Sequence, residues 1–156
     1  MPGVPFNRGQ KKLRRGRFSE TNYVYHVTST TFRRLRLFEP FEQGRIVVNA
    51  MKREHDAGHV DSFAFVVMPD HVHWLFQLQG TRSLSTTMNT VKSFSARRIN
   101  AVLGTSGRIW EPGFYDRAAR IDDEISQIAR YIVANPLRAG LVESIAKYPL
   151  WDCKWL

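Results

Sequence analysis

The stretch 66–78, "VVMPDHVHWLFQL", decides the fold, because it holds parts of two apolar runs separated by a turn. Pro69 and Asp70 form a turn dipeptide between the runs. Apolar runs on both sides of such a turn favour antiparallel strands. We therefore predict a β-hairpin with strands over 59–68 and 71–79.

The segments around this hairpin alternate between strand and helix patterns. Residues 22–30 alternate and are rich in Tyr, Val and Thr, which predicts a strand. Apolar residues at near-helical spacing predict a helix within 38–58 that stops at Gly58. After the hairpin we expect a helix over 83–104, a strand around 114–119 and a final helix over 122–142.

The two later helices have recognisable ends. Gly104 is expected to cap the helix over 83–104, and Asp122 is expected to be the N-cap of the last helix. One face of the helix over 83–104 collects apolar residues, namely Leu84, Met88, Val91, Ile99 and Val102.

The element order β-α-β-β-α-β, with a closing helix, is that of an α+β protein with a ferredoxin-like antiparallel sheet. Its helices are expected on one face, with the other face left free for a ligand or partner. Residues 1–20 are predicted to form a basic flexible arm, and residues 21–156 a single domain.

The net charge of +9 is concentrated in clusters. Clustered cations neutralise phosphates, which predicts a nucleic-acid partner, although a solvated tail and ordinary helix surface give the same pattern. The candidate DNA-binding residues are Arg14, Arg15 and Arg17 in the arm and Lys92, Arg97 and Arg98 in the second helix, with a further cluster at Arg33, Arg34 and Arg36.

Three features of the sequence indicate the compartment. No apolar run approaches the roughly 18 residues of a membrane span. The first residues lack the apolar segment of a secretory signal, and the single cysteine, Cys153, suits a reducing compartment. We expect a cytoplasmic protein with no membrane partner.

His71 and His73 stand one residue apart in the second hairpin strand. Side chains on a strand alternate between faces, so both imidazoles point to one side and Val72 to the other. The pair can contribute two ligands to a metal site, or can be hydrogen-bonded or solvent-facing histidines without a metal. The remaining histidines, His26, His55 and His59, are not expected to be ligands.

The closing helix offers a third ligand. Tyr131 and Asn135 are four residues apart, which places them on one helix face at the edge of the apolar stripe. An amide oxygen suits a hard cation such as Mg²⁺ or Mn²⁺. The alternative is that Tyr131 is an interfacial aromatic residue and Asn135 ends the helix before Pro136.

Five segments together resemble a known family. "MPDHVHW" (68–74) resembles the His-hydrophobic-His signature of HUH single-strand DNA nucleases. With "YHVTSTT" (25–31), "VKSFSARRIN" (91–100), "WEPGFYDRAARI" (110–121) and "YIVANPLRAGLV" (131–142), it resembles the REP-associated tyrosine transposases, relatives of the single-strand insertion-sequence transposases.

The resemblance implies a bacterial, nucleoid-associated endonuclease and strand transferase that acts on single-stranded or hairpin DNA. It places the nucleophile, which becomes joined to the 5′ phosphate, on Tyr131, and the ligands of Mg²⁺ or Mn²⁺ on His71, His73 and Asn135. Close transposase relatives often carry Gln at the position of Asn135. Relatives include dimers with shared active sites and monomers, so both states stay open.

Two other functions fit the same sequence. A non-catalytic module with an RNA-recognition-like sheet would stack single-stranded bases on Tyr23, Tyr25 and Trp74 and would need no metal. A metal-dependent phosphoesterase that uses water would need the metal but not Tyr131.

Overall fold

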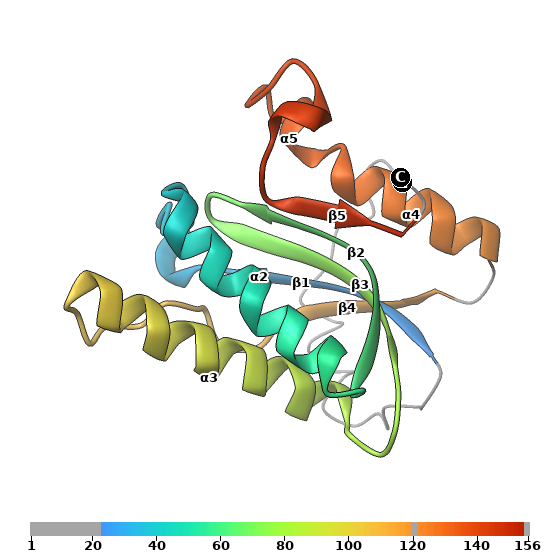
Figure 1. The fold of residues 1–156 in the computed structure, drawn as a ribbon, viewed down its shortest axis with the longest axis horizontal. Helices are drawn as coiled ribbons and strands as arrows, with labels where there is room; N and C mark the ends of the chain where they lie inside the picture. Colours follow the sequence, from blue (N-terminus) through green and yellow to red (C-terminus); the bar gives the residue numbers. More distant parts are fainter. Residues whose placement is uncertain (1–22, 120–121, 155–156) are drawn as a thin grey trace.

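The computed structural model describes residues 23–119 and 122–154. Five strands form one antiparallel sheet in the order β4-β1-β3-β2-β5 (Figure 1). The strands are β1 (Val24–Thr30), β2 (Val60–Met68), β3 (His71–Leu78), β4 (Tyr115–Ala119) and β5 (Trp151–Cys153). The first four have the predicted ferredoxin-like order, and β5 is an addition at the edge of β2.

The predicted hairpin is confirmed by the pairing of β2 with β3. Met68 lies opposite His71, so Pro69 and Asp70 alone make the turn. A register shift between Ser62 and Ala64 marks an irregularity farther along β2. The tight turn places the start of β3, and with it both histidines of the motif, at one end of the sheet.

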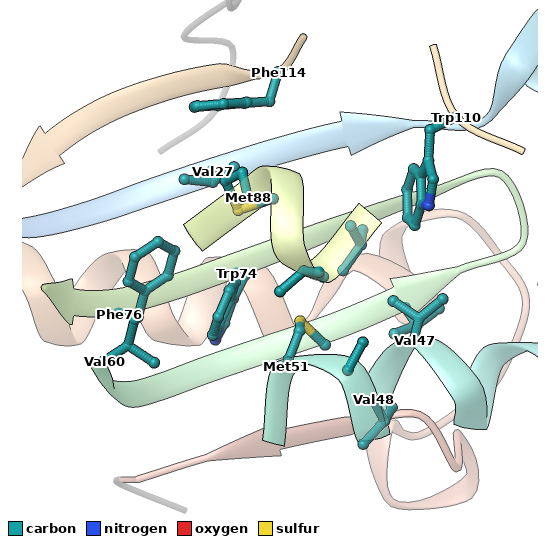
Figure 2. Packing of buried hydrophobic residues seen from close by; sticks show 14 of the residues in the cluster. Val27, Val47, Val48, Met51, Val60, Trp74, Phe76, Met88, Trp110 and Phe114 are labelled. Atoms are coloured by element: carbon teal, nitrogen blue, oxygen red, sulfur yellow. The ribbon is translucent and has the colours of Figure 1, made fainter. Parts of the chain in front are cut away.

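Helices α2 (Phe41–Asp56) and α3 (Leu84–Leu103) lie side by side on one face of the sheet (Figure 1). The main core is formed between them and the sheet, with Trp74 and Phe76 of β3 fully buried in it (Figure 2). Odd and even positions of β3 therefore serve different layers, as strand alternation requires.

The ends of α3 agree with the prediction, but its apolar face does not reach the last turn. Gly104 caps the helix at φ 66°, a left-handed conformation that glycine adopts at little cost. The side chain of Ser83 accepts a hydrogen bond from the Thr86 amide at the other end. The prediction was wrong for Val102, which is 56% exposed because the final turn projects past the sheet (Figure 1).

The second face of the sheet is not left free, contrary to the prediction. Helix α4 (Asp122–Val133) packs against it, and the apolar stripe of α4 forms a second core with β2 and β3. Val66 and Leu75 supply part of the strand side. The stripe that was predicted on this helix is buried throughout, at Ile125, Ile128, Ala129, Ile132 and Val133.

The closing helix is also shorter than predicted. It ends at Val133, and a short helix α5 (Asn135–Arg138) follows; two 3-10 turns, η1 (Phe32–Arg34) and η2 (Ile145–Lys147), complete the elements. The basic arm lies outside the described residues, and so does the side chain of Asp122. Across the described part of the chain, no helix is long and apolar enough to span a membrane.

Candidate metal and strand-cleavage site

The two histidines of the motif lie on the α4 face of the sheet, as the alternation predicted. His71 and His73 alternate with Val72 and Trp74, which point into the main core. Their ring centroids are 5.0 Å apart, with one ring edge-on to the other. Two imidazoles are thus gathered at the end of the sheet where the hairpin turns.

His73 is oriented by two side chains of the neighbouring strand β1. Its Nδ1 lies 3.0 Å from Nε2 of His26 and 3.0 Å from Oγ1 of Thr28. Both partners use the same ring nitrogen, so Nε2 of His73 is the nitrogen left for a metal. A bond to the second nitrogen is the usual means of fixing a metal-binding imidazole.

His71 is oriented by a different chain of contacts. Its Nδ1 is 2.7 Å from Oδ1 of Asp70, and Oδ2 of Asp70 accepts a hydrogen bond from Nε of Arg34 at 3.0 Å. A carboxylate on Nδ1 keeps the proton there and leaves Nε2 as the electron-pair donor. Asp70 is therefore both a turn residue and the positioning residue of His71.

The electrostatics favour neutral imidazoles, the form that binds metals. Burial lowers the pKa of His71, against the opposing influence of Asp70. Burial also lowers the pKa of His73 well below its ordinary value, and the charges of His26, His71 and Arg138 act in the same direction. Burial lowers the pKa of His26 to about 4.

These contacts indicate which metal ion the two imidazoles can bind. Two neutral imidazoles with the same nitrogen available fit a divalent transition-metal ion, of which Mn²⁺ is one. Within residues 23–119 and 122–154, no group of three His, Cys, Asp or Glu side chains is arranged to hold a metal. The predicted third ligand, Asn135, is an amide and is not one of these residue types.

Asn135 and Tyr131 do not share one helix, contrary to the prediction. Pro136 has no N–H with which to continue the ladder of α4, so the helix stops and Asn135 begins α5. The Ile132 carbonyl lacks a donor at Pro136 and accepts instead from Nδ2 of Asn135 at 3.1 Å. This bond uses the amide nitrogen and leaves the amide oxygen for a cation; its role as a ligand stays a prediction.

Tyr131 is half-buried near the end of α4, and Arg138 contacts both its ring and its backbone. The guanidinium lies 3.8 Å from the centroid of the phenol ring, and its Nη2 donates to the Tyr131 carbonyl at 2.7 Å. The charge of Arg138 also lowers the pKa of His73. Arg138 thus contacts the predicted nucleophile and acts on His73 through its charge.

Tyr115 shares the histidine face as well. It pairs with Thr28 across β1 and β4, and Thr28 pairs with His73 across β1 and β3. Three consecutive strands therefore present Tyr115, Thr28 and His73 on the same side. The choice between Tyr115 and Tyr131 as nucleophile stays a prediction in favour of Tyr131.

The predicted DNA-binding residues fall into three groups. Arg97 and Arg98 are exposed on α3, across the sheet from the histidines, and Arg98 stacks on Phe94 with its Cζ 4.7 Å from the ring centroid. Lys92 is half-buried, with its Nζ donating to two backbone carbonyls. The candidates Arg14, Arg15 and Arg17 lie outside the described residues. Their contacts with DNA stay predictions.

Arg33 and Arg34, from the further basic cluster of the sequence, lie at the histidine end of the sheet. Arg33 and Arg34 have φ of 55° and 56°, a left-handed conformation that costs non-glycine residues free energy and concentrates at functional sites. Both side chains are exposed. The sequence indicated this cluster but not its nearness to His71, which depends on the contact of Arg34 with Asp70.

Sequence reasoning missed the residues that orient the histidines. His26 was expected not to be a ligand, which stays a prediction, and its hydrogen bond with His73 was not foreseen. The signal was present in "YHVTST", where His26 and Thr28 have the same spacing as His71 and His73. Only the register of β1 against β3 shows that the two pairs meet.

Replacing Asp70 with Asn tests the orientation of His71. We expect the Mn²⁺ concentration for half-maximal DNA cleavage to rise by about 10- to 100-fold, as for other residues that support a metal ligand. DNA binding should not weaken, and excess Mn²⁺ should restore cleavage. Asp56→Asn, which removes an exposed carboxylate paired with Lys52, is the matched control. A loss that excess Mn²⁺ does not restore would mean that Asp70 acts through folding.

Comparison with known proteins gives a consistent set of relatives. The family model "Transposase IS200 like" matches residues 19–135. A REP-associated tyrosine transposase of Escherichia coli K12 is 28% identical over 87 residues, which are 55% of this chain and 50% of that protein. The chain thus spans about half the length of this curated relative.

Solved structures show the same fold. A REP-associated tyrosine transposase bound to a REP hairpin superposes with a TM-score of 0.70 and 23% identity, covering 86% of this chain and 79% of the other. A Deinococcus radiodurans protein assigned as a transposase gives a TM-score of 0.53 and 22% identity, covering 70% of this chain and 87% of the other.

Proposed function

Because the chain belongs to the IS200-like transposase family, we propose that it cuts and rejoins single-stranded or hairpin DNA through a covalent tyrosine intermediate. The observation that carries the proposal is the pair of neutral imidazoles, His71 and His73, each held through Nδ1 on one face of the sheet. Imidazoles whose other ring nitrogen is held in this way are typical of metal-binding histidines, which supports the proposal.

Tyr131 is the proposed nucleophile. Its phenol gives up its proton as the oxygen attacks the scissile phosphorus, the bond from phosphorus to the 3′ oxygen breaks, and the leaving 3′ oxygen takes up a proton. The products are a 5′-phosphotyrosine and a free 3′ hydroxyl. The phosphotyrosine keeps the phosphodiester energy, so attack by another 3′ hydroxyl rejoins the strand without ATP.

The protein side chains have distinct tasks in this step. Mg²⁺ or Mn²⁺, when bound by His71, His73 and Asn135, supplies Lewis acidity that polarises the phosphate and stabilises its developing charge. Arg138 lies against the ring of Tyr131, and its positive charge also acts on His73. A nucleophile held in one orientation reacts faster than one that is free to rotate.

Burial argues against the non-catalytic alternative. Tyr25 and Trp74 are 2% and 1% exposed and lie in the main core beneath α2 and α3. Neither ring can stack on a base without unfolding that core. The water-using phosphoesterase is distinguished by chemistry, since it leaves no DNA attached to protein.

We expect binding to favour hairpin or single-stranded DNA over a duplex of the same sequence, and to weaken steeply with salt. Cationic clusters account for the salt dependence, because each neutralised phosphate releases counterions. The described elements include no helix-turn-helix to read a duplex groove. Fluorescence anisotropy at several salt concentrations measures both effects, and equal affinity for the duplex would contradict the expectation.

The experiment that tests the function is incubation with 5′-labelled and 3′-labelled hairpin DNA in Mn²⁺. We expect a denaturation-resistant adduct that carries the label on the 3′ side of the cut, and none in EDTA. Cleavage with no adduct would favour the water-using enzyme. Binding with neither cleavage nor adduct would favour the non-catalytic module.

A further inference from the structure

A small hollow opens beside the histidine pair. It has a volume of about 280 Å³, and its walls include Thr28 and Thr30 of β1 together with Glu111 and Phe114 of the segment before β4. Thr28 connects the hollow to the site, because its Oγ1 is also 3.0 Å from Nδ1 of His73. Whatever occupies the hollow lies next to the proposed cleavage centre.

The walls of the hollow are fixed before any ligand binds. The Glu111 amide donates to the Thr30 carbonyl at 3.0 Å, and Oε1 of Glu111 accepts from the Arg33 amide at 2.8 Å. From α3, Nζ of Lys92 donates to the carbonyls of Glu111 and Gly113 at 2.7 and 2.6 Å. A preorganised site loses little conformational entropy on binding.

We propose that this hollow binds one unpaired nucleobase of the substrate strand, and that it selects a base with an amino group. The proposal rests on the proposed function, because it takes the ligand to be part of the DNA that reaches the histidine site. Lys92 is then a positioning residue for the base-binding segment.

Size and chemistry both support a single base. The volume lies just below the range of about 300–1,000 Å³ of drug-sized ligand sites, and a duplex end would not enter it. Pro112 and Tyr115 also line the hollow and offer apolar contact, and the two threonine hydroxyls can donate or accept. Unpaired bases are commonly recognised by such a combination of apolar contact and edge hydrogen bonds.

Glu111 determines the selectivity. An ionised carboxylate only accepts hydrogen bonds and has about four acceptor positions, so the bond from the Arg33 amide leaves others available. The amino groups of cytosine and adenine donate to such an acceptor, whereas the O4 carbonyl of thymine or uracil repels it. A base with an amino group is therefore preferred.

The test measures equilibrium binding in EDTA with hairpin DNAs that differ at one unpaired position at a time. Each position carries cytosine or uracil, and in a second series adenine or purine, which lacks the amino group. At one position we expect the amino base to bind at least about tenfold tighter, the effect of one good base contact. Glu111→Gln, whose amide oxygen still accepts from Arg33, should reduce this ratio to about threefold or less.

Two further variants complete the test. Glu143→Gln removes an exposed carboxylate paired with Lys147, and it should keep the wild-type ratio. Thr30→Val removes a wall hydroxyl without changing the size of the side chain, and it should lower affinity for the preferred base. It serves as the test variant if Glu111→Gln does not fold.

The proposal is overturned if no unpaired position distinguishes the paired bases, or if Glu111→Gln keeps the full wild-type ratio. Adduct formation in Mn²⁺ with the same DNAs tests the proposed function independently of the base site. An adduct without base preference leaves the function standing and removes the base site. A base preference abolished by Glu111→Gln, without an adduct on any DNA, supports the base site and removes the function.

Discussion

Tyr131→Phe is expected to fold, to bind hairpin DNA with the affinity of the wild type, and to form no covalent adduct. Phenylalanine keeps the ring beneath Arg138 and removes only the attacking oxygen. Loss of a nucleophile that forms the covalent intermediate removes the reaction route itself rather than slowing it. Denaturing gel electrophoresis with labelled hairpin DNA and Mn²⁺ measures the adduct.

The control for this substitution is Tyr115→Phe, which should still give the adduct. Tyr115 lies on the histidine face but is fixed on strand β4, paired with Thr28. Tyr131 lies on a helix end held by a side chain of α5. If cleavage survives in Tyr131→Phe and disappears in Tyr115→Phe, the nucleophile has been assigned to the wrong tyrosine.

The other tyrosines are poorly placed for this chemistry. Tyr25 is 2% exposed on the opposite face of the sheet. Tyr23 lies beside Leu78, at the end of β3 away from His71. The hydroxyl of Tyr148 donates to the Val67 carbonyl at 2.6 Å, and burial raises its pKa to about 12, which makes its phenolate hard to form.

His71→Ala and His73→Ala are each expected to lower cleavage by at least about 100-fold while DNA binding is kept. Removal of either imidazole takes away a predicted ligand, whereas contacts with the DNA backbone are expected from arginines elsewhere. His71 is the cleaner test, because its side chain is 17% exposed and His73 is buried against His26. Gel shift and adduct assays on the same samples separate binding from chemistry.

His55→Ala is the matched control for the histidine variants. Its side chain is 46% exposed and accepts a hydrogen bond from the Ser62 amide, so it takes no part in the histidine pair. Cleavage should stay at the wild-type level. The gel shift is also run with and without EDTA. If the His71 and His73 variants lose DNA binding as fully as they lose cleavage, and EDTA does not change DNA binding, the two histidines are structural.

Much of the fold could be predicted because its signals are local. The turn at Pro69 and Asp70, the left-handed cap at Gly104 and the stripe of α4 each depend on a few neighbouring residues, and each is confirmed. The packing of α4 on the second face was not predicted. A stripe shows that a helix buries one side, but it does not say which surface covers it.

The site was predictable only in part for the same reason. Strand alternation places His71 and His73 on one face from sequence alone. The contacts that orient them join residues 45 and 47 positions apart, and they exist only because β1 pairs with β3 in one register. The separation of Tyr131 from Asn135 had a local signal in Pro136, which also explains the hydrogen bond of the Asn135 amide.

The central claim is that Tyr131 becomes joined to DNA. Mass spectrometry of the peptide trapped after reaction with hairpin DNA and Mn²⁺ tests it most directly. The account predicts a 5′-phosphorylated nucleotide on Tyr131, in a peptide that includes part of helix α4. A nucleotide attached to Tyr115 or Tyr148, or cleaved DNA with no modified tyrosine, would contradict it.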